Sequence, residues 1–403
     1  MVDRVSQGAQ VAALDAALAR VKSRILTPAL VIDLDAAEHN LRTFQRRVHD
    51  ASASWRPHIK TVKQRTLTDL AIAQGITRFK CATLRELDLL CEAPTHPIEM
   101  DIVWAYPCTD AALSALSTRA RPEGVSITLL ADGPEHLRSL LDWARADGRE
   151  WGVMLDVDVG MCRTGTPPDG WDPARLRALL DPTAPLQLRG LHGYDGHHTA
   201  DARAEAHAAY DALVSLARAL ELDERHAIVT AGTHSYGHAL SHAGLRRDPC
   251  NLEVSPGTLV LSDLRSAPAV EDLGLRQAVY VMSRVVSTGA DRVTLDAGSK
   301  GLNPDIPPPH CTMLGWDGLC VAQPSEEHLP VHVPPGTPAP RRGDTVWLVP
   351  VHACTTVNLY QEVLYLRDGA FLRGGVVDAP GHSLWVDAPP GMGDGTREEH
   401  PST

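Results

Sequence analysis

The chain contains very little lysine and no excess of positive charge. Of its 38 basic residues, only five are lysines: Lys22, Lys60, Lys63, Lys80 and Lys300. The net charge of −12 at pH 7 argues against nucleic acid and anionic membranes as main partners. A sequence that prefers arginine keeps lysine mainly where arginine cannot replace it. The clearest such role is forming a Schiff base, because an amine can lose its proton and attack a carbonyl.

Three further features are missing. No run of about 18 apolar residues occurs, so no transmembrane helix is expected. The segment Met1–Gln7 lacks a basic head followed by an apolar core, which excludes a typical secretory signal. The eight cysteines include no Cys-x-x-Cys pair, which is typical of a reduced protein rather than a disulfide framework. We therefore expect a cytoplasmic protein that does not bind membranes.

Short apolar segments alternate with helical ones in the first two thirds of the chain. Helical patterns such as 134–146 and 202–220 separate several of the strands. This alternation predicts an α/β fold, a (β/α)8 TIM-type barrel over residues 27–265. The expected strands are a short one before Lys60 and the segments 29–32, 78–81, 102–104, 127–130, 153–157, 188–191 and 227–229.

After residue 265 the pattern changes, and no further helix is expected. Strand-like segments are separated by Gly, Pro and Asp turns, which predicts a C-terminal antiparallel β domain over 266–388. Its expected strands are 279–282, 292–295, 345–349 and 363–366. We expect an N-terminal arm over 1–26, with a helix from Val11 to Val21, and a disordered tail over 389–403.

Lys60 is the strongest single candidate for chemistry. It follows a short apparent strand and precedes a helix-like segment, and Pro57 keeps the chain extended between them. A barrel places its reactive groups at this end of its strands. The alternative is a solvated surface lysine.

Three loops carry residue types that suit an anionic ligand. Arg163 lies between glycines after the strand near 153–157, where it can approach a ligand closely. The segments 231–237 and 255–258 consist largely of small residues whose backbone N–H groups suit a phosphate. Each pattern also occurs in ordinary turns, so only their combination is informative.

His352 and Cys354 form a candidate metal site. If this segment is a strand, residues two apart point to the same face, which brings an imidazole and a thiolate together. The pair suits a borderline-soft divalent metal, above all Zn²⁺, and two protein ligands leave positions open for substrate. The alternative is a buried cysteine beside an unrelated histidine.

Together these features resemble the fold-type III pyridoxal-phosphate (PLP) enzymes that include D-threonine aldolase and eukaryotic-type D-serine dehydratase, whose barrel is alanine racemase-like. The resemblance covers about residues 27–374. The segments that carry it are Thr27–Asp35, Arg56–Lys63, Leu191–His197, Leu295–Leu302 and His352–Asn358. The chain departs from the family at Val62, where His is common, and at Ala231 and His234, where glycine is common.

The resemblance implies a homodimer and specific roles for residues. Lys60 would hold PLP, Arg163 would contact the ring oxygen, and Tyr194 would lie beside the cofactor. His197 and His198 are candidates for proton transfer, with solvated loop histidines as the alternative. The other residues expected to contact PLP are His58, Gly232, Thr233, Tyr236, Gly257 and Thr258.

The resemblance further implies a lyase that uses PLP and a divalent metal, Zn²⁺ or alternatively Mn²⁺, on D-3-hydroxy-amino acids. Aldolases of the family often carry Asp at the second metal position, whereas dehydratases carry Cys. Cys354 therefore favours dehydration of D-serine or D-threo-3-hydroxyaspartate over aldol cleavage of D-threonine. Two alternatives remain, a metal-free racemase or decarboxylase and a non-catalytic PLP-binding regulator. Regulators of that kind lack a β domain.

Overall fold

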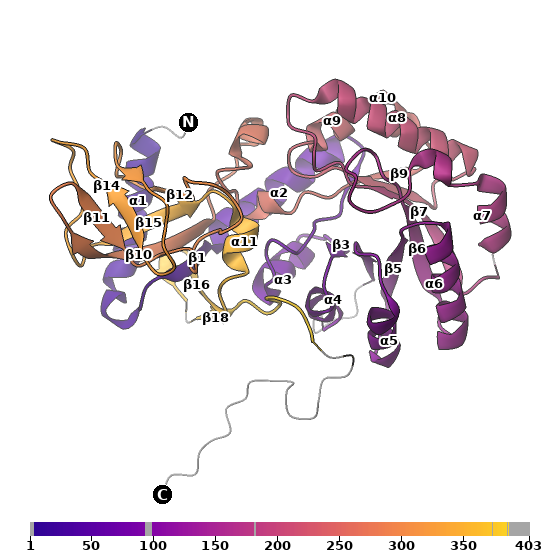
Figure 1. Cartoon of the computed structure of the whole chain (residues 1–403), viewed down its shortest axis with the longest axis horizontal. Helices are drawn as coiled ribbons and strands as arrows, with labels where there is room; N and C mark the ends of the chain where they lie inside the picture. Colours follow the sequence, from indigo (N-terminus) through magenta and orange to yellow (C-terminus); the bar gives the residue numbers. More distant parts are fainter. Residues whose placement is uncertain (1–3, 93–98, 181–182, 373, 385, 387–403) are drawn as a thin grey trace, which may run out of the picture.

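Two β-sheets organise the chain. The computed structural model describes residues 4–92, 99–180, 183–372, 374–384 and 386. A parallel barrel and a mainly antiparallel sheet domain lie side by side in Figure 1, with the short helix α11 (Ala353–Val357) between them. The predicted disordered tail, 389–403, lies outside the described residues. None of the helices in the described ranges is long and apolar enough to cross a membrane.

The barrel is built from eight parallel strands, which confirms the predicted architecture. Their order in the sheet is β2-β9-β8-β7-β6-β5-β4-β3. A parallel bridge between His58 and Lys80 links the two ends of this sheet and brings the barrel close to closure. The strands are β2 (Ser54–Trp55), β3 (Arg78–Cys81), β4 (Met100–Trp104), β5 (Val125–Ala131), β6 (Trp151–Asp156), β7 (Leu186–Gly193), β8 (Ala227–Thr230) and β9 (Asn251–Val254).

Helices connect the barrel strands and cover them, as Figure 1 shows. Local signals define their ends: the Thr83 side chain caps α4, and Gly148 ends α6 in the left-handed conformation. The α-helices are α2 (Leu34–Asp50), α3 (Arg65–Ala73), α4 (Leu84–Cys91), α5 (Asp110–Thr118), α6 (Pro134–Asp147), α7 (Pro173–Leu179), α8 (Arg203–Ala219), α9 (Tyr236–Ser241) and α10 (Ala243–Arg247). Short 3-10 helices are η2 (Pro168–Gly170) and η3 (Thr258–Val260).

The second sheet contains ten strands, including one from the start of the chain. β1 (Ala29–Asp33) pairs antiparallel with β10 and parallel with β16. The prediction that 29–32 is a barrel strand is therefore wrong, and β9, which was not predicted, completes the eight. The other strands are β10 (Val279–Thr288), β11 (Arg292–Leu295), β12 (Cys311–Met313), β13 (Cys320–Val321), β14 (Leu329–His332), β15 (Thr345–Pro350), β16 (Glu362–Arg367), β17 (Ala370–Phe371) and β18 (Gly375–Val376).

Helices flank this second sheet as well. The predicted N-terminal helix is present as α1 (Arg4–Ala19), and its Leu14 and Leu18 pack with Tyr280 and Trp347 of the sheet. The expectation that no helix follows residue 265 is wrong, because α11 and two 3-10 helices lie there. The remaining 3-10 helices are η1 (Lys22–Arg24), η4 (Ala267–Ala269) and η5 (Glu271–Leu273).

Candidate active site

Lys60 lies at the mouth of the barrel, on the segment that closes it. Arg56 anchors this segment: its buried guanidinium pairs with Glu253 of β9 at 2.5 Å and with Asp101 of β4 at 2.7 Å. Lys60 itself is half-buried and lines a cavity of about 540 Å³. The fold thus brings the predicted reactive lysine to a cavity large enough for a small ligand.

The other lysines occupy different environments. Lys63 also borders the cavity, but its buried amine is 2.7 Å from the Glu86 carboxylate and donates to the Ala379 carbonyl. Lys300 is exposed and lies 3.2 Å from both Glu326 and Glu327. Lys60 therefore meets two conditions together. It lines the cavity, and in the described part of the chain no carboxylate pairs with its amine.

His58 packs directly beneath the Lys60 backbone. Lys60 N donates to His58 Nδ1 at 3.3 Å. Burial, together with the nearby charge of Lys60, lowers the pKa of His58 well below its ordinary value, so the ring is neutral. Gly257 lies against this residue so closely that an added Cβ would be 2.3 Å from the His58 carbonyl oxygen. The loop after β9 is therefore fitted to the Lys60 segment, and this contact requires glycine.

The loops after β8 and β9 form a cradle for an anion. Within the described ranges, the backbone N–H groups of Thr233, His234, Gly257 and Thr258 donate to no protein acceptor. The Ser255 hydroxyl is buried and also has no partner there. Thr233, His234 and Thr258 line the cavity that contains Lys60, and unpaired backbone donors at such a place suit a phosphate. The residues present therefore fit the phosphate group of PLP.

Two of the predicted site residues, Tyr236 for the cofactor and His197 for proton transfer, have side chains outside this cavity. The Tyr236 ring is buried against Phe44, with ring centroids 5.0 Å apart, and does not line the cavity. Its pKa is raised to about 12 by burial. His197 is exposed and stacks on His198 at 3.9 Å, beside Gly160. Neither His197 nor His198 lines the cavity that contains Lys60.

Tyr194 is surrounded by cations. The centroid of its ring is 5.8 Å from Lys60 Nζ, 5.5 Å from Lys80 Nζ and 4.8 Å from Arg163 Cζ. Tyr194 lines the same cavity as Lys60 and Thr233. The structure therefore brings together Lys60, Arg163 and Tyr194, which the sequence analysis had selected from three separate strand ends.

His352 and Cys354 face the cavity from the β domain side. The prediction that they lie on a strand is wrong: β15 ends at Pro350, and His352 is the N-cap residue of α11. The two side chains are nevertheless in contact, because the first turn of the helix folds Cys354 back toward the imidazole. Thr61 follows Lys60, and its Oγ1 lies 3.0 Å from Cys354 Sγ. Thr258 Oγ1 lies 3.6 Å from the same sulfur.

Asp305 orients the His352 ring. Its carboxylate lies 2.7 Å from His352 Nδ1 and accepts a hydrogen bond from the Thr355 hydroxyl at 2.6 Å. A carboxylate can only accept, so Nδ1 carries the proton and Nε2 is left for another ligand. Burial alone would lower the pKa of His352, but Cys354 and Asp305 raise it to about 9. Burial alone would raise the pKa of Cys354, and His352 lowers it.

The His352–Cys354 pair fits a divalent metal by its chemistry. Imidazole nitrogen and thiolate sulfur are ligands that Zn²⁺ accepts, and two ligands leave coordination positions open. In the described part of the chain, no group of three or more His, Cys, Asp or Glu side chains is arranged to hold a metal ion. Among the described His, Cys, Asp and Glu side chains, His352 and Cys354 are thus the pair that would hold a cation here.

Sequence reasoning missed Asp305, Lys80, His192 and Asp156. Lys80 Nζ is 2.9 Å from His192 Nε2, and His192 Nδ1 is 2.7 Å from Asp156 Oδ1. The scarcity of lysine would have drawn attention to Lys80 by the same argument as Lys60. Asp305 lies in a proline-rich loop with no local pattern, so only the fold places it beside His352.

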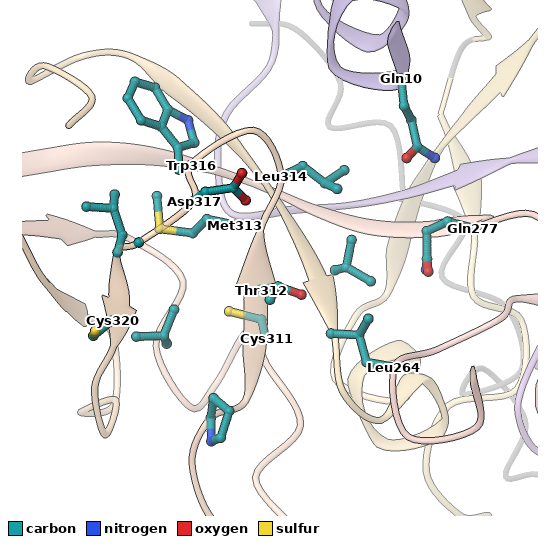
Figure 2. A pocket seen from close by; sticks show the side chains of 15 residues that line it. Gln10, Leu264, Gln277, Cys311, Thr312, Met313, Leu314, Trp316, Asp317 and Cys320 are labelled. Atoms are coloured by element: carbon teal, nitrogen blue, oxygen red, sulfur yellow. The ribbon is translucent and has the colours of Figure 1, made fainter. Parts of the chain in front are cut away.

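A second cavity, of about 470 Å³, lies in the β domain away from these residues (Figure 2). Its walls are mainly apolar, and it contains none of the predicted site residues. Figure 2 shows Cys311, Met313, Leu314 and Trp316 around it, with Gln277 at one side. The chemistry of the chain is thus concentrated in the cavity at the barrel mouth.

The fold and the site define a class. The model of the alanine racemase N-terminal domain family matches residues 32–260, more than half of the chain, so the chain belongs to that family. A second family model, described as a putative serine dehydratase domain, matches residues 278–366. This combination confirms the resemblance to the PLP-dependent D-threonine aldolase and D-serine dehydratase group.

Individual relatives agree with this assignment. The chain is 28% identical over 355 residues to D-threonine aldolase of Arthrobacter sp., covering 86% of this chain and 90% of the relative. It is 27% identical over 290 residues to D-threo-3-hydroxyaspartate dehydratase of Delftia sp., covering 69% and 73% respectively. The crystal structure of D-threonine aldolase from Filomicrobium marinum aligns with a TM-score of 0.77 at 25% identity, over 88% of this chain and 96% of that one.

Proposed function

We propose that the protein is a lyase for D-3-hydroxy-amino acids that uses PLP and a divalent metal, with elimination of water as its main reaction. The carrying observation is that the barrel lysine and the metal-ligand pair share one cavity: Thr61, next to Lys60, lies 3.0 Å from Cys354 Sγ. Relatives of both lyase types, an aldolase and a dehydratase, support the class of reaction.

Different residues of the cavity would bind the cofactor, its phosphate group and the cation. Lys60 holds PLP through its amine, and the N–H groups of the two loops after β8 and β9 hold the phosphate. His352 Nε2 and Cys354 Sγ hold the cation, which would act as a Lewis acid. PLP, when bound, draws electrons away from the α-carbon of the substrate. The Lys60 amine, once released, is the group that takes the α-proton at Nζ.

Elimination and aldol cleavage differ in the proton that is removed. Elimination requires the α-proton to go to Lys60, whereas cleavage requires a base for the substrate hydroxyl. The described residues that line the cavity include no aspartate or glutamate, so a histidine such as His234 would have to serve as that base. The thiolate at Cys354 favours Zn²⁺. Aldol cleavage remains the second candidate because of the structural similarity to D-threonine aldolase.

The decisive experiment supplies purified protein with D-serine, D-threonine and D-threo-3-hydroxyaspartate and identifies the products by mass spectrometry. We expect ammonia and a 2-keto acid from at least one substrate. Glycine and acetaldehyde from D-threonine, with no keto acid from any substrate, would move the assignment to an aldolase. Turnover of L-enantiomers alone would overturn the proposed stereochemistry.

Three further measurements test the roles of the residues and of the metal. Borohydride reduction and peptide mapping should place PLP on the peptide that contains Lys60, and a label on Lys63 or Lys300 would reject this role.

A chelator should abolish activity while the PLP absorbance remains. Full activity of a rigorously metal-free preparation would reject the proposed requirement for a metal.

Arg163→Ala should weaken PLP retention or alter the PLP spectrum, because a fixed cation beside the ring favours an anionic ring oxygen.

We also propose a homodimer that works in the cytoplasm. All eight cysteines are free in the structure, as a reducing compartment requires. The family resemblance supports the dimer, and light scattering of the purified protein at several concentrations tests it.

A further inference from the structure

Three buried polar side chains form a chain across the barrel interior. Lys80 lies on β3, at one end of the strand order, whereas His192 and Asp156 lie on β7 and β6, in the middle of that order. Each of the three is at most 3% exposed. Buried polar groups cost free energy unless they are paired, and the function proposed above does not use this chain.

The direction of the hydrogen bonds is determined by Asp156. Burial alone would raise the pKa of this carboxylate, but His192 lowers it, so Asp156 is ionised. An ionised carboxylate only accepts, which places the proton of His192 on Nδ1, 2.7 Å from Asp156 Oδ1. His192 Nε2 must then accept from Lys80 Nζ at 2.9 Å. The hydrogen bond to His192 fixes the position of the Lys80 amine.

The Lys80 amine is held against the ring of Tyr194. Its Nζ is 5.5 Å from the ring centroid, and Lys60 Nζ is 5.8 Å from the same centroid. Burial, followed by the charge of Lys60, lowers the pKa of Lys80 to about 7, while Asp156 opposes this shift. Tyr194 thus lies between the Lys80 amine and the cavity, which it lines together with Lys60.

We propose that Lys80 is a positioning residue of the cofactor site, anchored by His192 and Asp156, and that it sets the place and the electrostatic environment of Tyr194 beside PLP. This inference rests on the proposed PLP site. It assigns a role to Lys80, a lysine of the barrel that does not line the cavity containing Lys60.

The test is the PLP-loaded Lys80→Met variant, studied by absorbance spectroscopy and by titration of the apoprotein with PLP. We expect an altered absorbance spectrum and a PLP affinity lower by about 3- to 30-fold, the range of a desolvated cation–π contact. Lys300→Met, which removes an exposed lysine, should leave both unchanged. A combined Lys80→Met and Tyr194→Leu protein should bind PLP no more weakly than Tyr194→Leu alone, because Lys80 acts through the ring.

Asp156→Asn provides a second test that preserves side-chain volume. An amide can donate to His192 Nδ1, which turns Nε2 into a donor and removes the acceptor of Lys80. We expect the same spectral change, with a smaller loss of affinity. An unchanged spectrum and affinity in a folded Lys80→Met protein would overturn the inference alone. Wild-type protein that binds no PLP, or carries it on a residue other than Lys60, would instead overturn the proposed function.

Discussion

Lys80 is an unusual lysine because the fold holds it where its charged form is disfavoured. The pKa falls from 10.5 to about 7 on folding, chiefly through burial. The unfolded chain therefore binds more protons between these two values, and stability must rise with pH across that window. At pH values below about 7, Lys80 is protonated in both the folded and the unfolded protein. The folded protein then carries the full free-energy cost of burying this charge.

This shift predicts a pH-dependent difference between two proteins. The free energy of unfolding of the wild-type apoprotein, minus that of Lys80→Met, should increase from pH 7 toward pH 10. Its slope should be at most about 1.4 kcal/mol per pH unit. Urea unfolding at a series of pH values measures it, and the subtraction removes groups common to both proteins. A difference that is constant with pH would show that Lys80 titrates normally.

Asp305 gives a second prediction at the residue scale. Asp305→Asn keeps the size of the side chain but removes the carboxylate that fixes the tautomer of His352. We expect metal affinity to fall by about 10- to 100-fold, measured by competition with a chromogenic chelator. Asp211→Asn is a matched control, because Asp211 also pairs with a histidine, His242 at 3.1 Å, outside the cavity. Equal effects of the two variants would contradict the role of Asp305.

At the scale of elements, the cavity depends on how closely two loops approach each other. Gly257 of the loop after β9 lies against the His58 carbonyl oxygen, where an added Cβ would be 2.3 Å away. At Gly232 an added Cβ would meet Tyr194 at 3.4 Å, an ordinary contact. Of these two predicted phosphate-binding glycines, Gly257 is thus the one that a close approach requires.

Gly257→Ala should destabilise the apoprotein by about 1–3 kcal/mol, the usual cost of overpacking. Gly232→Ala should change the free energy of unfolding much less. Urea unfolding of both variants and of the wild type measures the contrast. PLP retention should fall with Gly257→Ala as well, since the displaced loop carries two of the unpaired N–H groups. Equal stability of the two variants would refute the argument from close approach.

The elements also show what could be predicted from the sequence. The place of Lys60 at a cavity was predictable, because lysine scarcity and a strand end single it out without tertiary information. His352 and Cys354 do line the same cavity, but they belong to the start of a helix rather than to the predicted strand. The prediction for Tyr236 was wrong about its side chain. The small-residue loop indicates where the backbone lies but not where the ring points, and the ring packs in the core. Asp305 could not be found, because its partner lies 47 residues away.

On the scale of the whole molecule, the two sheets are not independent units. β1 comes before the barrel in the sequence but pairs with β10 and β16 of the second sheet. Sequence pattern could not reveal this, since a buried strand of four or five apolar residues looks the same in either sheet. One continuous core contains barrel side chains together with Ala353 and Val357 of α11 and Val363 of β16.

This shared core predicts that barrel and β domain unfold together. In urea, the far-UV circular dichroism of the whole chain and the fluorescence of Trp347, isolated by replacing the other tryptophans with Phe, should give one coincident transition. Trp347 lies on β15 and is buried at 1% exposure, so it reports on the second sheet. The cavity provides a functional reason, because Lys60 and the proposed metal ligands come from opposite sides of this junction. Two separated transitions would show that one sheet melts while the other remains folded, which would contradict the coupling of the two sheets through this core.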